Sequence, residues 1–375
     1  MLLKDLCDHN IGTYGIGASA CAYNEEYPVY LRITDISDDG KLLKPFRASI
    51  NPKDYPNWKD YILKMNDLVF ARTGNSTGRN YFHNTNEQLV YAGFLIRFSI
   101  NPSKVLPRYV GYYCQSESYW NQIKTFLEGS TRPTMNAELY KSLDIPIVAR
   151  ELQQHIVDTI GSVDDLIENY DNQAHIICSL LKAELKKFST VIPFSFYSPR
   201  IIKSGIKTFD TTKIYLDTSS VEGVNEIFEG EAITFCRRPS RANMQPIANS
   251  VWFAKMKGSN KIIVVSEKDT DLITGTIFST GFLGIEATKN LPLSLLTAFL
   301  ISDSFHVKRD MCSVGTTMAS INNDSFLRIT VPYLNSKEID LFESKYKYPV
   351  QTLCLLRRKI AHLKQAKADL LAKYF

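Results

Sequence analysis

Two polar segments that contain arginine offer the side chains best suited to an anionic ligand. The first, Arg72-Thr73-Gly74-Asn75-Ser76-Thr77-Gly78-Arg79, follows the apolar run 68–71. Its two glycines let the backbone turn and approach a ligand closely. Its hydroxyl, amide and guanidinium groups match phosphate oxygens and the edges of bases. The candidate DNA contacts in this segment are Arg72, Thr73, Asn75, Ser76, Thr77 and Arg79.

The second segment, Arg237-Arg238-Pro239-Ser240-Arg241-Ala242-Asn243, follows Phe235 much as Arg72 follows Phe70. Arginine-bearing loops are often only solvated surface, but recurrence at an equivalent place favours contact with DNA. The candidates here are Arg237, Arg238, Ser240, Arg241 and Asn243. Arg132, in the polar segment 129–136, is a further candidate, although a structural turn explains that segment equally well.

The two halves of the chain resemble each other, and such repeats decide how a fold is interpreted. Residues 129–136 align with 315–322 at an offset of 186, and 182–185 align with 367–370 at 185. Three shorter matches lie upstream in the same order: Leu106-Pro107 with Leu291-Pro292, Gly93-Phe94-Leu95 with Gly281-Phe282-Leu283 at an offset of 188, and Val29-Tyr30-Leu31 with Ile214-Tyr215-Leu216 at 185. The chain is therefore an internal duplication with a pseudo-two-fold repeat.

The middle of each copy breaks this register. Phe70 and Arg72 match Phe235 and Arg237 only at an offset of 165. We therefore expect the second copy to lack about twenty residues at this place, relative to the first.

Each copy ends in a long amphipathic helix. Apolar residues recur at steps of four and three from Leu152 to Phe188, which is typical of a helix that packs along its length. Residues 151–188 would span about 57 Å as a helix. A similar stripe runs from Ile339 to Tyr374, with Asn335 or Ser336 as its cap. Pro349 removes a hydrogen bond from this second helix, so we expect a bend there, or a restart with the proline in the first turn.

The sequence predicts an α+β fold with two globular parts. Short apolar runs at 29–36, 68–71 and 261–265 predict strands, whereas 106–126 and 291–307 predict helices. The expected domains are 1–147 and 191–333, and the expected long helices are 148–190 and 334–375. The two helices can pair as an antiparallel coiled coil, or each can pack on its own globular part; the length of the stripes favours pairing.

Composition fits a folded protein that is neither secreted nor inserted in a membrane. The net charge of +5 permits an anionic partner without requiring one. No apolar run approaches the roughly 18 residues that a membrane span needs, and the first ten residues lack the apolar core of a signal peptide. Seven scattered cysteines form no C-x-x-C pair, and the histidines do not fall at metal-ligand spacing from them. We expect a reduced, cytoplasmic protein without metal or cofactor.

Motifs of the common active sites are missing from the sequence. It contains no P-loop, no G-x-S-x-G, no glycine-rich S-adenosylmethionine loop and no N/D-P-P-Y/F motif. Glu267-Lys268 follows a predicted strand, as nuclease residues often do, but it lacks an acidic partner upstream. These absences favour a non-catalytic binding protein, with an unrecognised methyltransferase or nuclease as the enzymatic alternative.

The sequence resembles the DNA-specificity subunits of type I restriction–modification systems in several short segments and in the order of these segments. The segments are 30–36 with Gly40 after it, 67–74, Gly129-Ser130-Thr131 leading to Ile145-Pro146-Ile147, and the helix end 181–185. A weaker series of similar segments follows in the second copy. The second copy departs from the family pattern at 237–243, where the usual glycine is absent, and at Pro349.

The resemblance implies two tandem target-recognition domains, each followed by a spacer helix. Each domain would read one half of a split double-stranded DNA sequence. The paired helices would set the gap between the halves and dock two methyltransferase subunits, which carry the cofactor and the catalysis. A motor–nuclease restriction subunit would join the complex for cleavage. Outside this family, the alternative is a coiled-coil scaffold that does not touch DNA.

Overall fold

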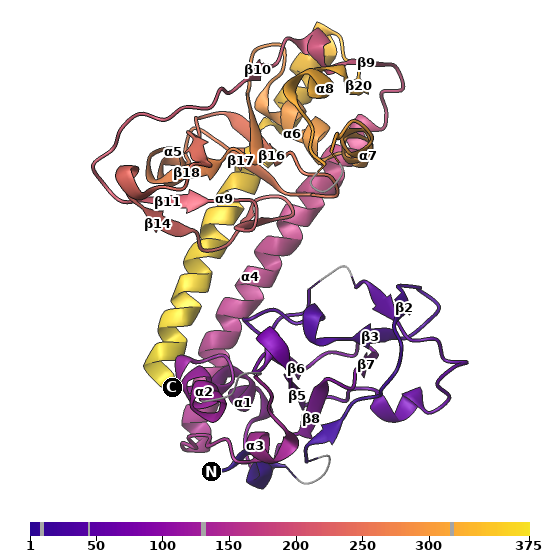
Figure 1. The fold of residues 1–375 in the computed structure, drawn as a ribbon, viewed down its shortest axis with the longest axis vertical. Helices are drawn as coiled ribbons and strands as arrows, with labels where there is room; N and C mark the ends of the chain where they lie inside the picture. The colour runs from indigo at the N-terminus through magenta and orange to yellow at the C-terminus, as the bar shows by residue number, and fades with distance from the viewer. Residues whose placement is uncertain (8–10, 44–45, 129–132, 316–318) are drawn as a thin grey trace. The chain divides into compact units, whose positions relative to one another are not determined.

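The computed structural model describes residues 1–7, 11–43, 46–128, 133–315 and 319–375. The chain divides into two compact units: unit 1 comprises Met1–Leu166 and Lys364–Phe375, and unit 2 comprises Ile167–Leu363. Two long helices, α4 (Arg150–Leu185) and α9 (Ser336–Tyr374), each contribute residues to both units (Figure 1). The predicted α+β class is confirmed.

In the residues that the structure describes, unit 1 contains two four-stranded sheets and three short α-helices. The first sheet has the order β1-β8-β5-β6 and is antiparallel; the second has the order β2-β4-β3-β7, with β3 and β7 parallel. The strands of the first sheet are β1 (Thr13–Tyr14), β8 (Leu95–Ser99), β5 (Asp67–Ala71) and β6 (Asn80–His83). Those of the second are β2 (Cys21–Ala22), β4 (Ala48–Ser49), β3 (Val29–Leu31) and β7 (Leu89–Tyr91). The helices are α1 (Pro107–Tyr113), α2 (Glu117–Leu127) and α3 (Ala137–Lys141).

Unit 2 repeats the antiparallel sheet and the parallel strand pair, although its second sheet has the parallel pair in the middle and not at the edge. Its antiparallel sheet has the order β10-β19-β16-β17, and its mixed sheet β14-β11-β18-β15 again holds one parallel pair, β11 and β18. The strands of these sheets are β10 (Arg200–Ile201), β19 (Phe282–Glu286), β16 (Ser250–Ala254), β17 (Ile262–Val265), β14 (Glu231–Ile233), β11 (Lys213–Leu216), β18 (Thr276–Ser279) and β15 (Ala242–Met244). Two small ladders pair β12 (Val221–Glu222) with β13 (Glu226–Ile227), and β20 (Thr330–Pro332) with β9 (Val191–Pro193). The helices are α5 (Thr270–Gly275), α6 (Leu293–Ile301), α7 (Asp303–Met311) and α8 (Asn323–Arg328).

The equivalent strands correct the predicted alignment of the two copies. β5 corresponds to β16 at an offset of 183, and β8 corresponds to β19 at 187. The expected loss of about twenty residues from the second copy is therefore wrong, because the offset does not fall to 165 in this region. The match of Gly93-Phe94-Leu95 is also wrong by one position, since Leu95 pairs with Ala71 as Phe282 pairs with Ala254.

Three predicted elements are shorter than expected, and local hydrogen bonds explain why. The strand that begins at Val29 ends at Leu31, because Asp35 binds the backbone and guanidinium of Arg32 and closes a 3-10 turn. The helix predicted at 106–126 is divided into α1 and α2 by Ser116, whose hydroxyl caps Tyr119 N. Ser302 divides the helix predicted at 291–307 in the same way.

The long helices agree with their predicted positions within a few residues. Asn335 caps α9 as expected: its side chain accepts from Glu338 N at 3.0 Å, and the Glu338 carboxylate accepts from Asn335 N at 2.8 Å. Pro349, however, lies deep inside one continuous helix. The predicted restart is therefore wrong.

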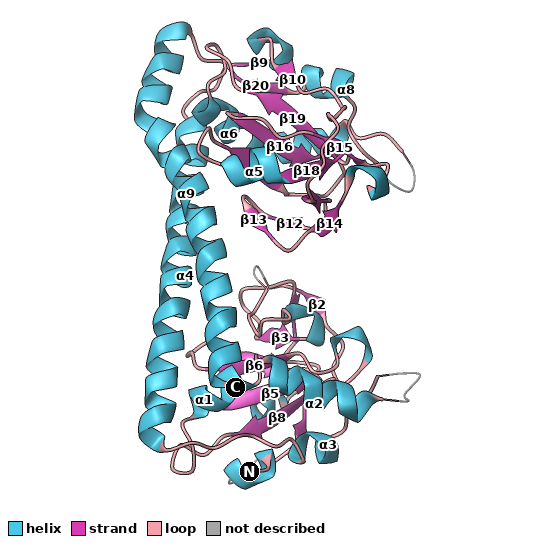
Figure 2. Cartoon of the chain, turned by 90° about the vertical axis from the view of Figure 1, so that its left-hand side faces the viewer, coloured by secondary structure: helices cyan, strands magenta, loops and turns pink. Residues whose placement is uncertain are grey.

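Each unit has its own core, to which parts of the long helices contribute. In unit 1 the core lies between the β1-β8-β5-β6 sheet and helices α1 to α3 (Figure 2), with Phe70 stacked on Tyr140 at 4.6 Å. In unit 2 a buried ion pair fixes α9 to the sheet, because Arg357 contacts Asp269 at 2.5 Å and donates to Val264 O. The helices are thus integral to the units.

Candidate nucleic-acid interface

The segment 72–79 leaves strand β5 in a conformation fixed by backbone hydrogen bonds. Arg72 N donates to Phe94 O at 3.0 Å, and Met135 N donates to Arg72 O at 2.8 Å. Thr73 forms an antiparallel bridge with Thr134. The first residues of the loop are therefore held between β8 and the segment that leads to α3.

Two buried tyrosines support the far end of the same loop. The Tyr140 hydroxyl donates to Ala71 O at 2.7 Å and accepts from Gly78 N at 3.2 Å, and the Tyr119 hydroxyl donates to Gly78 O at 2.6 Å. Burial raises the pKa of both hydroxyls, which keeps them neutral. Gly78 has a φ of +93°, and an added Cβ would lie 2.8 Å from the Trp120 ring, so the position requires glycine.

The candidate side chains of this loop differ in how free they are to bind DNA. Asn75 is exposed, while Thr73 and Ser76 are half-buried. The Arg72 guanidinium lies 4.9 Å from the Tyr14 ring, and its Nε has no hydrogen-bond partner among the described residues.

Two further candidates are already engaged inside the protein. The buried Thr77 hydroxyl lies 2.8 Å from Gly74 O, and Arg79 pairs with Asp38 at 2.6 Å. Arg132 lies outside the described residues.

The loop of unit 2 equivalent to 72–79 is 255–261, not 237–243. Lys255 N donates to Gly281 O at 2.9 Å, and Ile321 N donates to Lys255 O at 3.1 Å. Arg72 makes the same two backbone hydrogen bonds, with Phe94 O and Met135 N. Met256 bridges to Ser320 as Thr73 bridges to Thr134. The prediction of equivalence for 237–243 is therefore wrong. A signal for the correct match was present: Phe-Ala followed by a basic residue occurs at 70–72 and again at 253–255.

The segment 237–243 instead leads into β15, before strand β16. The Arg238 guanidinium stacks on the Phe235 ring at 3.9 Å, so it is partly engaged. Arg237, Ser240 and Arg241 are exposed, and Asn243 is half-buried. Burial, and then the charge of Arg241, lower the pKa of Lys255. Arg241 is thus a near neighbour of the residue that takes the place of Arg72.

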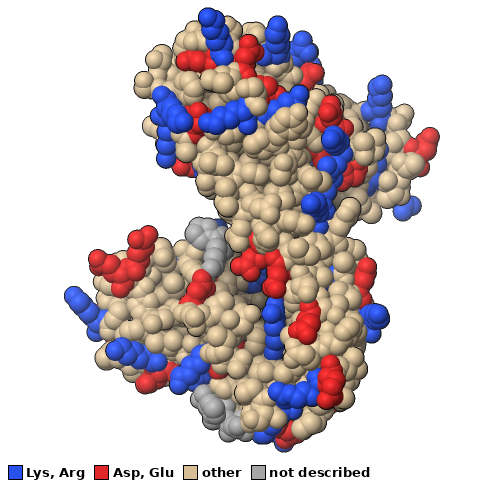
Figure 3. Space-filling model, turned by 180° about the vertical axis from the view of Figure 1, so that it is seen from behind, with Lys and Arg blue, Asp and Glu red and all other residues tan. Residues whose placement is uncertain are grey.

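Surface charge does not by itself single out an interface. On the face that Figure 3 shows, Lys and Arg side chains are interspersed with Asp and Glu side chains on both units. The two loops are therefore identified by their backbone positions and by the chemistry of their side chains.

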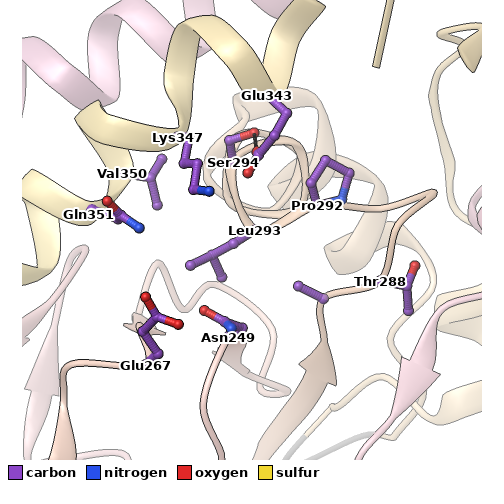
Figure 4. Close-up of a pocket in the computed structure, with 11 residues that line it drawn as sticks. Asn249, Glu267, Thr288, Pro292, Leu293, Ser294, Glu343, Lys347, Val350 and Gln351 are labelled. Carbon is purple, nitrogen blue, oxygen red and sulfur yellow. Dashed lines mark hydrogen bonds between the residues drawn. The ribbon is translucent and has the colours of Figure 1, made fainter. Parts of the chain in front are cut away.

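A pocket of about 280 Å³ lies in unit 2, lined by α9, the start of α6 and the loops at Asn249 and Glu267 (Figure 4). The Ser294 hydroxyl donates to Glu343 across its rim, and Lys347 points into the same space. Within the described part of the chain, no group of three or more His, Cys, Asp or Glu residues could hold a metal ion. We assign this pocket no part in the interface.

Comparison with known proteins finds one family model and several solved structures that resemble the chain. Residues 1–176 match the family model described as the type I restriction modification DNA specificity domain. The S subunit of a type I restriction–modification system from M. genitalium is similar over 100% of this chain and 95% of its own, with 15% identity and a TM-score of 0.51. The HsdS subunit from Thermoanaerobacter tengcongensis is 14% identical over 100% and 95% of the two chains, with a TM-score of 0.36. No curated protein matches the chain.

Residues 1–176, a little under half of the chain, are therefore similar to the DNA-specificity domain of type I restriction–modification systems. The likeness to the M. genitalium subunit extends the same fold over the whole chain. Among the described residues, no helix is both long and apolar enough to span a membrane.

Proposed function

We propose that this chain is the non-catalytic DNA-recognition subunit of a type I restriction–modification complex. Residues 1–147 and 191–333 form two target-recognition domains, and each reads one half of a split double-stranded sequence. The observation that carries the proposal is the repeat. Unit 2 reproduces the antiparallel sheet, the parallel strand pair and the backbone contacts of the loop 72–79 that are found in the part that matches the DNA-specificity model.

The long helices, at 148–190 and 334–375, form an antiparallel coiled coil that sets the gap between the half-sites. Contacts inside each unit support this part of the proposal. In unit 1, Lys367 pairs with Asp164 at 2.7 Å. In unit 2, Lys359 lies 4.9 Å from the Tyr170 ring and Tyr346 donates to Glu184 at 2.7 Å, so position numbers fall along α9 as they rise along α4.

The helices also dock two methyltransferase subunits, which supply the cofactor and the catalysis, and a restriction subunit joins the assembly for cleavage. This division of labour fits a cytoplasmic protein that acts on cellular DNA. Within it, loop cations contact phosphates and fix the register on the duplex, while a few base-edge contacts specify the sequence.

The deciding experiment is co-expression with the methyltransferase subunit, followed by methylation mapping of the host DNA. We expect a split motif with a fixed gap, methylated only when this chain is present. Recovery of the complex without any new methylation would favour a scaffold that does not touch DNA. Methylation by the purified chain alone would favour an enzyme.

The spacer role has its own test. Four residues are inserted in α4 beside Asn172 and four in α9 beside His362, which keeps the helices matched in length. We expect a longer preferred gap and unchanged half-sites in the methylation map. An unchanged gap would contradict the role of the helices as spacers.

The loop assignment is tested by replacing Arg72 and Arg79 with Gln in the assembled complex. Each cation that contacts a phosphate contributes close to one unit to the slope of log affinity against log salt concentration. Because Arg79 is held by Asp38, we expect R72Q to reduce this slope more than R79Q does. Unchanged affinity and slope in the double variant would remove this loop from the interface.

A further inference from the structure

The loop of unit 2 presents an apolar row where unit 1 presents hydroxyl groups. Met256 occupies the position of Thr73 and bridges to Ser320, which bridges in turn to Val314. Val314 and Ser320 exchange two backbone hydrogen bonds of 3.1 Å. Partners across an antiparallel bridge point to the same face with Cβ atoms about 5 Å apart. Met256, Ser320 and Val314 therefore form one row of side chains.

This row faces solvent. Met256 is 44% exposed and Val314 is 71% exposed, and Ser320 between them is exposed as well. A single exposed apolar residue needs no explanation. Two apolar side chains that flank a hydroxyl, all three fixed by backbone pairing, form a surface with a defined shape.

The loop under Met256 is held in place by a buried cation. Arg309 is fully buried, pairs with Asp310 at 2.6 Å and donates to Ser259 O. Asp310 also accepts from Gly258 N at 3.1 Å. The apolar row is therefore presented by a preorganised loop, so little ordering entropy opposes binding.

Basic residues are sequence neighbours of the row. Lys255 and Lys257 lie on either side of Met256 in the chain, and Arg241 is a near neighbour of Lys255. Two carboxylates beside this loop are paired with cations: Asp310 with Arg309, and Glu222 with Lys261 of the loop itself. A ligand that combines negative charge with a small apolar group suits such a surface. In the major groove of DNA, the 5-methyl group of thymine is that apolar group, and it lies close to the phosphates.

We propose that Met256 and Val314 form a contact site for the 5-methyl group of a thymine in the half-site that unit 2 reads, with the Ser320 hydroxyl available to an adjacent base edge. The proposal rests on the proposed DNA-recognition function. Thr73, at the equivalent position of unit 1, offers a hydroxyl where Met256 offers an apolar surface, so the two units differ in the base features that they favour.

The test uses the complex assembled with its methyltransferase subunits and the split sequence from the methylation map. Each thymine of both half-sites is replaced in turn by deoxyuridine, which removes only the methyl group, and affinity is measured at constant salt. We expect one thymine whose replacement weakens binding by about fourfold, the effect of one buried methyl group. The double variant M256S/V314S, which removes the methyl and thioether groups of both side chains, should bind the thymine and uracil duplexes equally at that position.

Met311 provides the matched control. It is 81% exposed in the same unit, at the end of α7 and outside the row, so M311S should leave the thymine preference unchanged. A target without thymine, or equal affinity of the wild-type complex for every uracil duplex, overturns the proposal. Loss of complex assembly in M256S/V314S, together with no thymine preference in the wild-type complex, would instead identify a protein-docking surface. If no split sequence is recognised at all, the proposed function fails first.

Discussion

The two units support equivalent loops with different side chains. In unit 1 the hydroxyls of Tyr140 and Tyr119 bind the backbone beneath the loop. In unit 2 the equivalent residues are Phe326 and Phe305, which have no hydroxyl to offer. Arg309 provides the support instead, through the Ser259 carbonyl.

The equivalence of these positions follows from the helix caps. Asn136 caps α3 as Asn322 caps α8, and Ser116 caps α2 as Ser302 caps α7, all with the side chain accepting from the backbone N–H three residues later. Both pairs are separated by 186 residues. The backbone frame is therefore common to both units, while the side chains that brace each loop are exchangeable. Because the backbone is common and only the supporting side chains differ, the loop sequence can vary without moving the strands.

Among the variants that test this difference between the units, replacement of the buried Arg309 should have the largest effect on stability. In R309M the Ser259 carbonyl and the Asp310 carboxylate lose their charged donor, at a cost of about 3 kcal/mol. Hydrogen exchange of the full chain should show faster exchange at 256–259, with unit 1 unaffected. R328M, which removes an exposed cation from α8, is the control. Unchanged protection at 256–259 would show that Arg309 does not support the loop.

The loop glycines differ in a way that can be measured. Gly78 has a φ of +93° and would place a new Cβ 2.8 Å from Trp120, whereas Gly258, at +76°, has open space around it. We expect G78A to cost about 2 kcal/mol, from strain and a clash, and G258A about 1 kcal/mol, from backbone strain alone. Denaturant unfolding followed separately in each unit by hydrogen exchange would measure both. Equal costs would mean that Trp120 moves aside freely.

The sequence predicted the parts of this architecture whose signals are long and periodic. The stripes of α4 and α9, and the repeat around Asn136 and Asn322, extend over many residues and could be found without a structure. The loop equivalence failed because a short Phe-x-Arg match at Phe235 was preferred to the Phe-Ala-basic match at Phe253. Only strand pairing distinguishes the two.

The support beneath the loops could not be predicted from the sequence. Tyr140 is 62 residues from Gly78, and Arg309 is 50 residues from Ser259. Neither pair has a local sequence pattern. At Pro349 the local sequence was misleading. A proline usually breaks a helix, but α9 continues through Pro349 because it packs on the core of unit 2.

Removal of one hydroxyl should make the loop of unit 1 resemble that of unit 2. In Y140F, Ala71 O and Gly78 N lose a buried partner, which should cost about 1 kcal/mol. We expect faster exchange at 73–78 and no change at 256–259. F326Y, the reverse change, should not stabilise unit 2, because Arg309 already donates to a backbone carbonyl of this loop. A stabilised F326Y would show that the two supports can coexist.

The smallest effect at neutral pH concerns His306, which takes the place of Trp120 four residues after the capping serine. Burial, and then the charges of Arg309 and Lys182, lower the pKa of His306 to about 4. A histidine with a lowered pKa stabilises the folded state fully above the unfolded value near 6.5 and loses that contribution as pH falls towards 4. Hydrogen exchange should therefore show protection of α7 and 256–259 falling between pH 6.5 and 4, after correction for the intrinsic pH dependence of exchange.

The equivalent part of unit 1, with Trp120, should show no such loss of protection, and H306Q should abolish the loss in unit 2. The same decline in both units would assign the pH dependence to other groups.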